Sequence, residues 1–371
     1  MSAPRLLIDL EKLHHNALTL VQRLAVDSIS VTGVTKAALG APEIGKVLLR
    51  AGVESLAGSR IENLESMCRG GVPASMTLIR SPMLSQVDRV VAHADVSFNT
   101  ELDTISALSL AADRAGRTHG IILMVELGDL REGIMPNDLE EAARQVLHLP
   151  NIALKGIGTN LACRSGVSPD TNNMAVLSSL ADSIEASCGT MLDIVSGGNS
   201  ANIQWALSGT DTGRINNLRL GESILLGREP LQRQAIDGLH TDAITLVAEV
   251  IETKVKPSHP WGEIAQAAFG EPLPSIDRGD IRQTIFAIGH QDTDHCGLLA
   301  PQGIKILGAS SDHLIVDSSR YHENLTVGSE VTFGLNYSAL LRAMTSPFVA
   351  KVMMKSSTPR LPAETVQSCR A

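Results

Sequence analysis

The stretch Ile29 to Glu43, I-S-V-T-G-V-T-K-A-A-L-G-A-P-E, contains the unit from which we expect most of the chain to be built. Its first residues, 29–34, predict a short buried strand, and Pro42 suits the first turn of a helix. Between the two lies a single lysine, Lys36. Burial and neighbouring charges can make such an amine a nucleophile toward a carbonyl, and the alternative is a surface lysine in a loop.

The same alternation of strand and helix continues to about residue 226. Helical patterns separate the predicted strands, as in Glu101–Ala115, where Leu102, Ile105, Leu108 and Ala112 fall on one stripe. Eight such units favour a (β/α)8 barrel. No G-x-G-x-x-G follows an early strand, which makes an open doubly wound sheet the weaker alternative. The predicted strands are Ile29–Val34, Ser55–Ala57, Met76–Ile79, Val96–Phe98, Ile121–Glu126, Ala153–Thr159, Leu192–Val195 and Asn217–Leu220.

A second domain is expected from about residue 231, where the pattern changes. Strand-like segments there are separated by Gly, Pro, Asp and Ser turns, and the one expected helix is Ser338–Met344. The predicted fold class is therefore α/β, with a TIM-type barrel over residues 10–230 and a mostly β C-terminal domain over residues 231–371. A strand within residues 1–9 is expected to pair with this second domain. The other expected strands are Ala243–Lys256, Gln283–Ile288, Ile304–Leu307, Leu314–Val316 and Glu330–Phe333.

Composition argues against several classes of function. The formal net charge is −9 and no cluster of Lys and Arg is present, so a nucleic-acid partner is not expected. No apolar run approaches the roughly 20 residues that span a bilayer, and no signal-peptide pattern opens the chain, so no membrane partner is expected. The 5 cysteines are scattered without a C-x-x-C motif. This pattern predicts a reduced, cytoplasmic protein with neither a disulfide framework nor a zinc site.

In a barrel the functional groups lie at the C-terminal ends of the strands. Lys36 follows the first predicted strand, Arg131 the fifth and Asn160 the sixth. The run S-G-G-N-S, residues 196–200, follows the seventh strand, and the eighth carries Arg219. A corner rich in Gly and Ser can bind a phosphate dianion, although such runs also form ordinary turns. Together with the lysine, this set predicts pyridoxal 5′-phosphate, which needs a Schiff-base lysine, a phosphate site and a partner for its ring nitrogen.

These residues belong to a longer series of motifs that runs through the chain. In order, the most specific are V-T-K-A, S-R-I-E-N-L, G-I-G-T-N-L, S-G-G-N-S, L-R-L-G-E, L-G-A-S-S-D-H-L-I-V-D and L-N-Y-S-A-L-L-R-A-M-T-S-P. With them the chain resembles, nearly end to end, the fold-type III pyridoxal-phosphate racemases of the alanine racemase family, and within it the ornithine racemase-like branch. The resemblance implies an isomerase that interconverts the L and D forms of a basic amino acid, ornithine or lysine, by a two-base mechanism.

The resemblance also implies a role for each matching residue. Lys36 would bind the cofactor covalently, and Arg219 would face the pyridine nitrogen and keep it unprotonated. Asn160 takes the place of a histidine against the face of the ring. Arg131 would bind the substrate carboxylate, and the alternative is an ion pair with neighbouring acids of its loop. The remaining expected contacts are Ser200, Gly221, Glu222 and Tyr337 with the cofactor, and Ser311 and Asp312 with the substrate.

Three positions depart from the pattern of the family. Gly40 stands where alanine racemases have a tyrosine, and Met124 stands where they have a lysine that is often carbamylated. Their second acid–base tyrosine lies in a G-Y-x-D pattern, whereas this chain has G-H-Q-D at residues 289–292. Racemisation needs two groups on opposite faces of Cα. We expect Lys36 on one face and His290 on the other, because imidazole transfers protons near neutral pH.

The loop that contains His290 leaves several assignments open. Asp292 is also expected to be catalytic, with His295 and Cys296 as alternatives, and no metal is expected although the cluster admits zinc. The resemblance implies a homodimer in which this loop reaches the barrel of the partner. Rival functions are a carrier of the same cofactor without turnover, and a fold-related decarboxylase or aldolase. The candidates to pair with a distal amine of the substrate are Glu62, Asp129, Glu132 and Asp294.

Overall fold

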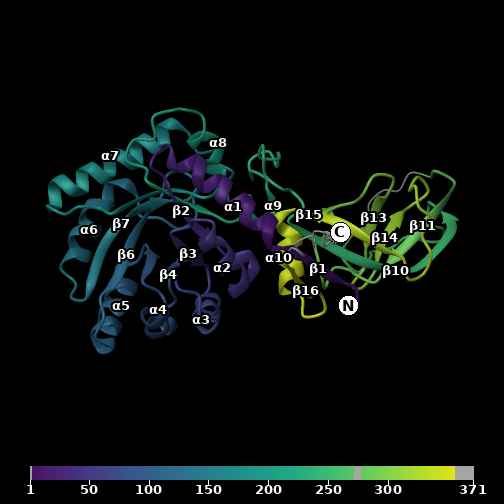
Figure 1. Cartoon of the computed structure of the whole chain (residues 1–371), viewed down its shortest axis with the longest axis horizontal. Coiled ribbons are helices and arrows are strands. Elements are labelled where there is room, and N and C mark those ends of the chain that lie inside the picture. The colour runs from purple at the N-terminus through teal and green to yellow at the C-terminus, as the bar shows by residue number, and fades with distance from the viewer. Residues whose placement is uncertain (1, 271–276, 356–371) are drawn as a thin grey trace, which may run out of the picture.

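A closed barrel of parallel strands forms the N-terminal part of the structure, a computed structural model that describes residues 2–270 and 277–355. The barrel lies on the left of Figure 1. Its strands pair in chain order, and β9 closes the ring by pairing with β2. The predicted barrel is confirmed. Its strands are β2 (Ser30–Val34), β3 (Ser55–Gly58), β4 (Ser75–Leu78), β5 (Val96–Asn99), β6 (His119–Val125), β7 (Ile152–Thr159), β8 (Ile194–Gly198) and β9 (Asn217–Leu220).

Helices cover the outside of the barrel, and each buries an apolar stripe against the strands. In α5, Ile105, Leu108 and Ala112 are buried, as the spacing predicts. Inside the ring, Phe98 and Met124 belong to a separate small apolar cluster. The helices are α1 (Leu10–Ala25), α2 (Pro42–Arg50), α3 (Ile61–Arg69), α4 (Val87–His93), α5 (Leu102–Ala115), α6 (Leu139–Leu147), α7 (Thr171–Cys188), α8 (Ile203–Ala206) and α9 (Glu222–Leu226).

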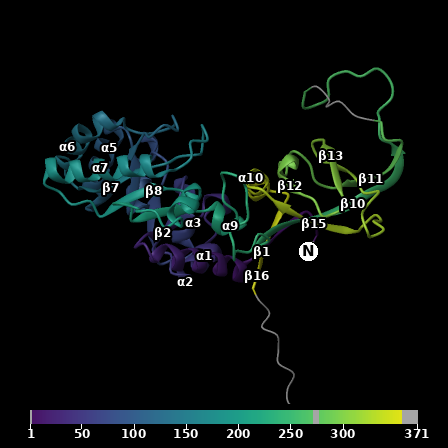
Figure 2. The ribbon, with the colours of Figure 1, turned by 90° about the horizontal axis from the view of Figure 1, so that it is seen from above.

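The C-terminal part is a β domain built on one sheet with the order β12-β15-β10-β11-β14-β13. Neighbours along this path are antiparallel, and Figure 2 shows β10 running through the domain. The helix α10 (Tyr337–Thr345) lies between this sheet and the barrel in Figure 1. The strands are β10 (Ile244–Pro257), β11 (Asp280–Phe286), β12 (Leu298–Leu299), β13 (Lys305–Ala309), β14 (Leu314–Asp317), β15 (Glu330–Leu335) and β16 (Ala350–Met354).

The first strand of the chain, β1 (Arg5–Asp9), belongs to the β domain. It pairs antiparallel with β10 and parallel with β16, and its inward side chains Leu6 and Ile8 are fully buried. The next residue begins α1, whose first backbone amides donate to the carboxylate of Asp9 and which packs on the barrel. The two parts are therefore joined at the N-terminus as well as through the segment between α9 and β10, in which the predicted boundary at residue 230 falls.

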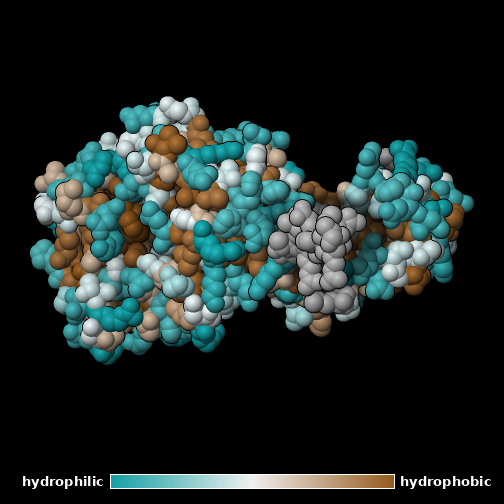
Figure 3. All heavy atoms as spheres, in the orientation of Figure 1, coloured by the Kyte–Doolittle hydropathy of each residue, from teal (hydrophilic) through white to brown (hydrophobic). Residues whose placement is uncertain are grey.

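Some elements differ from those expected from the sequence. Residues Ser196 to Gly198, expected in a loop, complete β8, because Gly198 has a φ of 146° that lets the strand continue to the turn. The strands β12 and β16 were not expected, since their pairing depends on partners distant in the sequence. The C-terminal residues 358–371 lie outside the described part of the chain. Figure 3 shows hydrophilic residues over much of one face, and no described helix is long and apolar enough to cross a membrane.

Candidate active site

One cavity of about 370 Å³ opens at the C-terminal ends of the barrel strands, and we call it the Lys36 cavity. Its volume falls within the roughly 300–1,000 Å³ typical of small-molecule sites. Side chains and backbone from many separate barrel turns meet here, together with the first residue of α10. Of the residues predicted from the sequence, those that line it are Lys36, Arg131, Glu132, Asn160, Ser200, Arg219, Gly221, Glu222 and Tyr337.

Lys36 is placed by the turn that follows β2. It is the first residue of a short 3₁₀ helix, η1 (Lys36–Ala38), and its side chain is half-buried. Its Nζ lies 5.6 Å from the ring centroid of Tyr337. Within the described part of the chain, no hydrogen bond or ion pair engages the amine. The amine is therefore available for covalent chemistry inside a partly enclosed site.

Gly40 ends the lysine turn, and its backbone explains why no tyrosine stands there. Its φ is 66°, in the left-handed region. A Cβ at this position would lie 2.2 Å from the carbonyl oxygen of Asn63. The close approach of the two backbones excludes a side chain at residue 40, so this departure from the alanine racemase pattern is structural.

Arg219 lies on β9 at the floor of the cavity, and only 4% of it is exposed. One terminal nitrogen donates to Ser196 Oγ at 2.5 Å, and the other donates to the carbonyl oxygen of Thr159 at 2.7 Å and to Asn160 Oδ1 at 3.4 Å. The guanidinium also stacks on the ring of Phe98, 4.7 Å from its centroid. Burial lowers the pKa of Arg219 to about 10, so the side chain stays charged at neutral pH.

A chain of hydrogen bonds behind Arg219 fixes its position. Ser196 Oγ, which accepts from Arg219, donates to Asn217 Oδ1 at 2.7 Å. Asn217 Nδ2 donates to Thr32 Oγ1 at 3.0 Å, and that hydroxyl lies 2.9 Å from the hydroxyl of Ser55. The chain crosses β9, β8, β2 and β3 inside the barrel. Because each of these polar groups has a hydrogen-bond partner, the free-energy cost of burying them is offset and their positions are fixed.

The corner between β8 and β9 is shaped for a small anion. Ser200 Oγ lies 3.4 Å from the amide of Gly221 and 3.2 Å from the amide of Ser223, so two backbone donors already converge on one oxygen. A Cβ at Gly221 would lie 3.1 Å from the carbonyl oxygen of Val34, so glycine lets this turn approach the end of β2 closely. Burial raises the pKa of the Glu222 carboxyl, whose oxygen lies 3.6 Å from Arg233. The carboxylate of Glu222 is thus partnered by the cation of Arg233.

Asn160 lines the cavity and has a buried side-chain donor without a partner among the described residues. Its Oδ1 accepts from Asn199 Nδ2 at 3.1 Å and from Arg219 at 3.4 Å. Its Nδ2 is buried and has no hydrogen-bond partner within the described residues. A buried amide donor is costly to leave unsatisfied, so a ligand acceptor above the barrel floor fits this position.

Arg131 and Glu132 form an ion pair on the cavity wall. An Arg131 terminal nitrogen donates to Glu132 Oε1 at 2.6 Å, and the Arg131 Nε also contacts this carboxylate. The loop is held by Glu126, whose carboxylate accepts from the amides of Gly128, Leu130 and Arg131. The ion pair within the loop, raised as an alternative for Arg131, is thus present, and both partners line the cavity.

The four acids considered for a distal amine have different surroundings. Glu132 lines the cavity, whereas Glu62 pairs with Arg89 at 3.0 Å on the outer surface. Asp129 is buried and accepts from the amides of residues 163–165. Asp294 accepts from the hydroxyl of Ser338 at 2.6 Å in the β domain. Of the four, only Glu132 is in a position to face a ligand in this cavity.

The loop His290–Cys296 lies in the β domain and does not line the Lys36 cavity of its own chain. The ring of His290 packs against Phe269 at 4.1 Å and against His295 at 4.7 Å between centroids. Asp292 is buried, and its carboxylate accepts from the Ser346 hydroxyl at 2.9 Å and from the Gly289 amide at 3.3 Å. These bonds hold the loop, so the surroundings of Asp292 favour a structural role over the catalytic one that was expected.

Ser311 and Asp312 contact this same loop rather than the cavity. Gln291 donates from its backbone amide to the Ser311 carbonyl oxygen at 3.1 Å and from its side chain to Asp312 at 2.6 Å. Both lie in the turn between β13 and β14, and neither lines the Lys36 cavity of the same chain. Their expected contact with a substrate therefore depends on a second copy of the chain.

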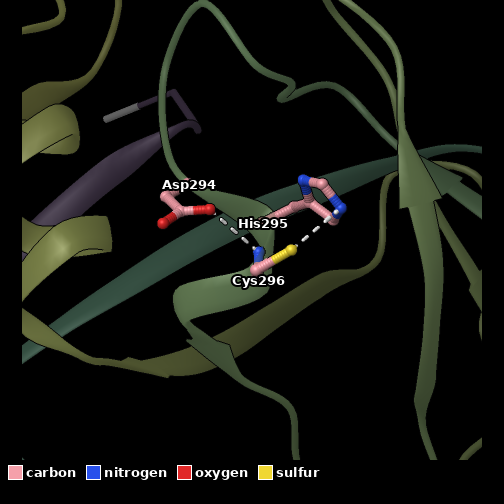
Figure 4. A group of neighbouring side chains, drawn as sticks. All are labelled: Asp294, His295 and Cys296. Atoms are coloured by element: carbon pink, nitrogen blue, oxygen red, sulfur yellow. Dashed lines mark hydrogen bonds between the residues drawn. The ribbon is translucent and has the colours of Figure 1, made fainter. Parts of the chain in front are cut away.

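Asp294, His295 and Cys296 of this loop lie close together at the start of η5 (His295–Gly297), as Figure 4 shows. Potential ligand atoms of Asp294, His295 and Cys296 all lie within 4.8 Å of one another. Asp294 also accepts from the Cys296 amide at 3.2 Å, and Cys296 Sγ lies 3.4 Å from His295 Nε2. Because Asp294 also binds Ser338 next to Tyr337, the cluster is tied to the helix whose first residue reaches the cavity.

Several cavity residues were not predicted from the sequence. Arg80 follows the third barrel strand, so the rule that placed Lys36 and Arg131 at strand ends would have found it. Asn199 was quoted within S-G-G-N-S but not assigned, although its side chain caps η4 and bonds Asn160. Ser59 begins the quoted motif S-R-I-E-N-L but was not assigned a role. Four further lining residues, Ala162, Cys163, Leu225 and Pro230, carry no signal in their local sequence that indicates a site.

Comparison with known proteins places this site in a family. Residues 8–229 match the family model described as the alanine racemase N-terminal domain, which covers the whole barrel. The chain belongs to the alanine racemase family. It is 40% identical over 353 residues to the ornithine racemase of Acetoanaerobium sticklandii, covering 95% of this chain and 99% of that protein. It is 36% identical to the lysine racemase of Thermotoga maritima with the same coverage.

Solved structures of the alanine racemase family share the fold. The alanine racemase of Bartonella henselae, described with covalently bound pyridoxal phosphate, superposes with a TM-score of 0.71. The match covers 95% of this chain and 100% of that one at 16% identity. At that identity the likeness supports the architecture alone, a barrel followed by a β domain.

Proposed function

We propose that this protein is a pyridoxal-phosphate-dependent racemase that interconverts the L and D forms of a basic amino acid, ornithine or lysine. The observation that carries the proposal is the Lys36 cavity. In it meet a lysine whose amine has no partner among the described residues, a charged buried arginine and a corner of backbone donors. The relatives with 40% and 36% identity, which are ornithine and lysine racemases, support the choice of reaction and of substrate class.

The residues present fit this cofactor. Lys36 would hold it covalently, and Ser200 with the amides of Gly221 and Ser223 would hold its phosphate. Arg219 would donate to the ring nitrogen, and the unused Nδ2 of Asn160 would meet an acceptor of the cofactor. When bound, the cofactor delocalises the electron pair left on the substrate Cα after proton removal.

The chain's own residues would then move the proton. Lys36 would remove or deliver it on one face of the substrate, and a second group must act on the opposite face. We assign that second role to His290 of a partner chain in a homodimer, because the loop of His290 does not line the cavity of its own chain. Asp292 would hold this loop through Ser346. A cytoplasmic location stays a prediction from the sequence.

Covalent labelling tests the cofactor assignment. After incubation with pyridoxal phosphate, borohydride reduction and digestion, peptide mass mapping is expected to find the label on Lys36. Lys36→Ala is expected to lose it, whereas Lys46→Ala, a substitution of an exposed lysine in α2, is expected to keep it. Label spread over exposed lysines, and unaltered by Lys36→Ala, would contradict the assignment.

A further inference from the structure

Arg80 is the cation of the Lys36 cavity that the proposed function leaves unexplained. It lies two residues after β4, its side chain is half-buried, and it lines the cavity. Across residues 2–270 and 277–355, no hydrogen bond or ion pair engages its guanidinium. The hydroxyl of the next residue, Ser81, is enclosed and also has no partner there. A half-buried arginine without a carboxylate is costly, and such a group is commonly paired by a ligand.

The other arginines of the cavity are already engaged. Arg131 is neutralised by Glu132, which contacts both its Nε and a terminal nitrogen. Arg219 donates to Ser196 and Thr159 at the floor of the barrel. A carboxylate that enters the cavity therefore meets one arginine whose charge and donors are both unused, and that arginine is Arg80.

The position of Arg80 around the barrel separates it from the phosphate corner. Its strand, β4, and β8, which leads to Ser200, have three strands between them in either direction around the closed ring. The two groups therefore lie on opposite sides of the cavity mouth. An anion bound at Ser200 leaves Arg80 free, and a molecule that spans the cavity would bring its other end toward Arg80.

We propose that Arg80 binds the α-carboxylate of the amino-acid substrate and is the main determinant of affinity for that group. This inference rests on the proposed function and replaces the role expected for Arg131, which becomes a supporting wall residue held by Glu132. The guanidinium fork of Arg80 would bind the carboxylate through two N–H donors. A lysine at this position would keep the charge but lose the fork.

A comparison of two ligands tests the assignment. The holoenzyme is titrated with racemic ornithine, whose composition the enzyme cannot change, and with putrescine, the same molecule without the carboxylate. Binding is followed by the cofactor absorbance. Arg80→Met is expected to weaken binding of ornithine by about 10- to 100-fold, the range for loss of a charged hydrogen-bonded contact, and to change putrescine binding less than about twofold. Arg80→Lys is expected to give an intermediate loss.

Two further variants make the test specific. Arg60→Met alters an exposed arginine two residues after the preceding barrel strand, β3, and is expected to bind both ligands as the wild type does. Arg131→Met is expected to weaken ornithine binding less than Arg80→Met. The inference is overturned if Arg80→Met binds ornithine normally, or if it weakens the binding of ornithine and putrescine equally. It is also overturned if Arg80→Met makes the protein monomeric, or if Arg131→Met weakens ornithine binding more than Arg80→Met does. Failure of the wild type to racemise ornithine would instead overturn the proposed function.

Discussion

At the scale of single residues, His119 shows how burial controls charge in this barrel. The side chain is 1% exposed at the start of β6, and its Nε2 lies 2.8 Å from the hydroxyl of Ser97. Burial lowers the pKa of His119 to about 4, from an ordinary value of 6.5. The folded protein therefore keeps this imidazole neutral over a range of pH in which the unfolded chain protonates it.

The stability of the fold is expected to depend on pH through His119. As pH falls from about 6.5 to 4, the unfolded state takes up a proton that the folded state does not, so the free energy of unfolding falls. Relative to His119→Gln, which can bond Ser97 but does not titrate, the wild type is expected to lose about 2 kcal/mol between pH 7 and pH 5. Chemical denaturation of both proteins at the two pH values measures this. If the difference in unfolding free energy between the two proteins is the same at pH 7 and pH 5, His119 takes up a proton in the folded protein as it does in the unfolded chain.

The sequence predicted many of the site residues because they are placed by a rule of the fold. Lys36, Asn160 and Arg219 all lie at the ends of barrel strands and line one cavity. Their partners could not be predicted, since the bond from Arg219 to Ser196 joins two strands whose side-chain directions depend on the barrel. Arg80 also follows a barrel strand, so the same rule applies to it, but it was missed because none of the motifs quoted from the sequence contains it.

At the scale of secondary-structure elements, the buried hydrogen bonds across β2, β8 and β9 join the barrel floor to the site. Ser196→Ala removes both the acceptor of Arg219 and the donor to Asn217. Because two buried polar groups lose a partner, the free energy of unfolding is expected to fall by about 1–3 kcal/mol. Cofactor affinity is expected to fall as well, as Arg219 loses its orientation. Chemical denaturation and a cofactor titration measure the two effects.

The matched control for this substitution is Ser179→Ala, at an exposed position of α7. It is expected to change the free energy of unfolding by less than about 0.5 kcal/mol and to leave cofactor affinity unaltered. Equal effects of the two substitutions would mean that the interior hydrogen bonds do not hold Arg219.

Element types were predicted better than their ends. The barrel strands and the helix from Pro42 follow from local periodicity, which a sequence displays directly. Two features do not follow from local periodicity. The end of β8 at Gly198 depends on a positive φ, and β16 depends on pairing with β1 at the opposite end of the chain. Long-range pairing of this kind leaves no local pattern.

At the scale of the whole molecule, the proposal places each active site between two chains. Three residues expected at the substrate lie in the β domain, away from the Lys36 cavity of their own chain: His290 as the second acid–base group, and Ser311 and Asp312 as substrate contacts. The strand β1 pairs in the β domain, and α1, which follows it directly, packs on the barrel. This connection holds the two parts together and so fixes the position of the His290 loop relative to the barrel.

Mixing inactive subunits tests whether the sites are shared. Lys36→Ala and His290→Ala are each expected to be inactive alone. After they are unfolded and refolded together, half of the dimers would be mixed and each would hold one intact site, so about a quarter of wild-type activity is expected. Activity assays and analytical ultracentrifugation check this. If both residues act within one chain, the mixture stays inactive.

The most direct test of the account is to incubate the holoenzyme with L-ornithine in deuterated water and follow both chirality and isotope at Cα. We predict that D-ornithine forms with deuterium at Cα, and that Lys36→Ala lowers the rate by at least about a thousandfold. Release of carbon dioxide with formation of putrescine, or no exchange at Cα by a protein that carries its cofactor, would contradict it.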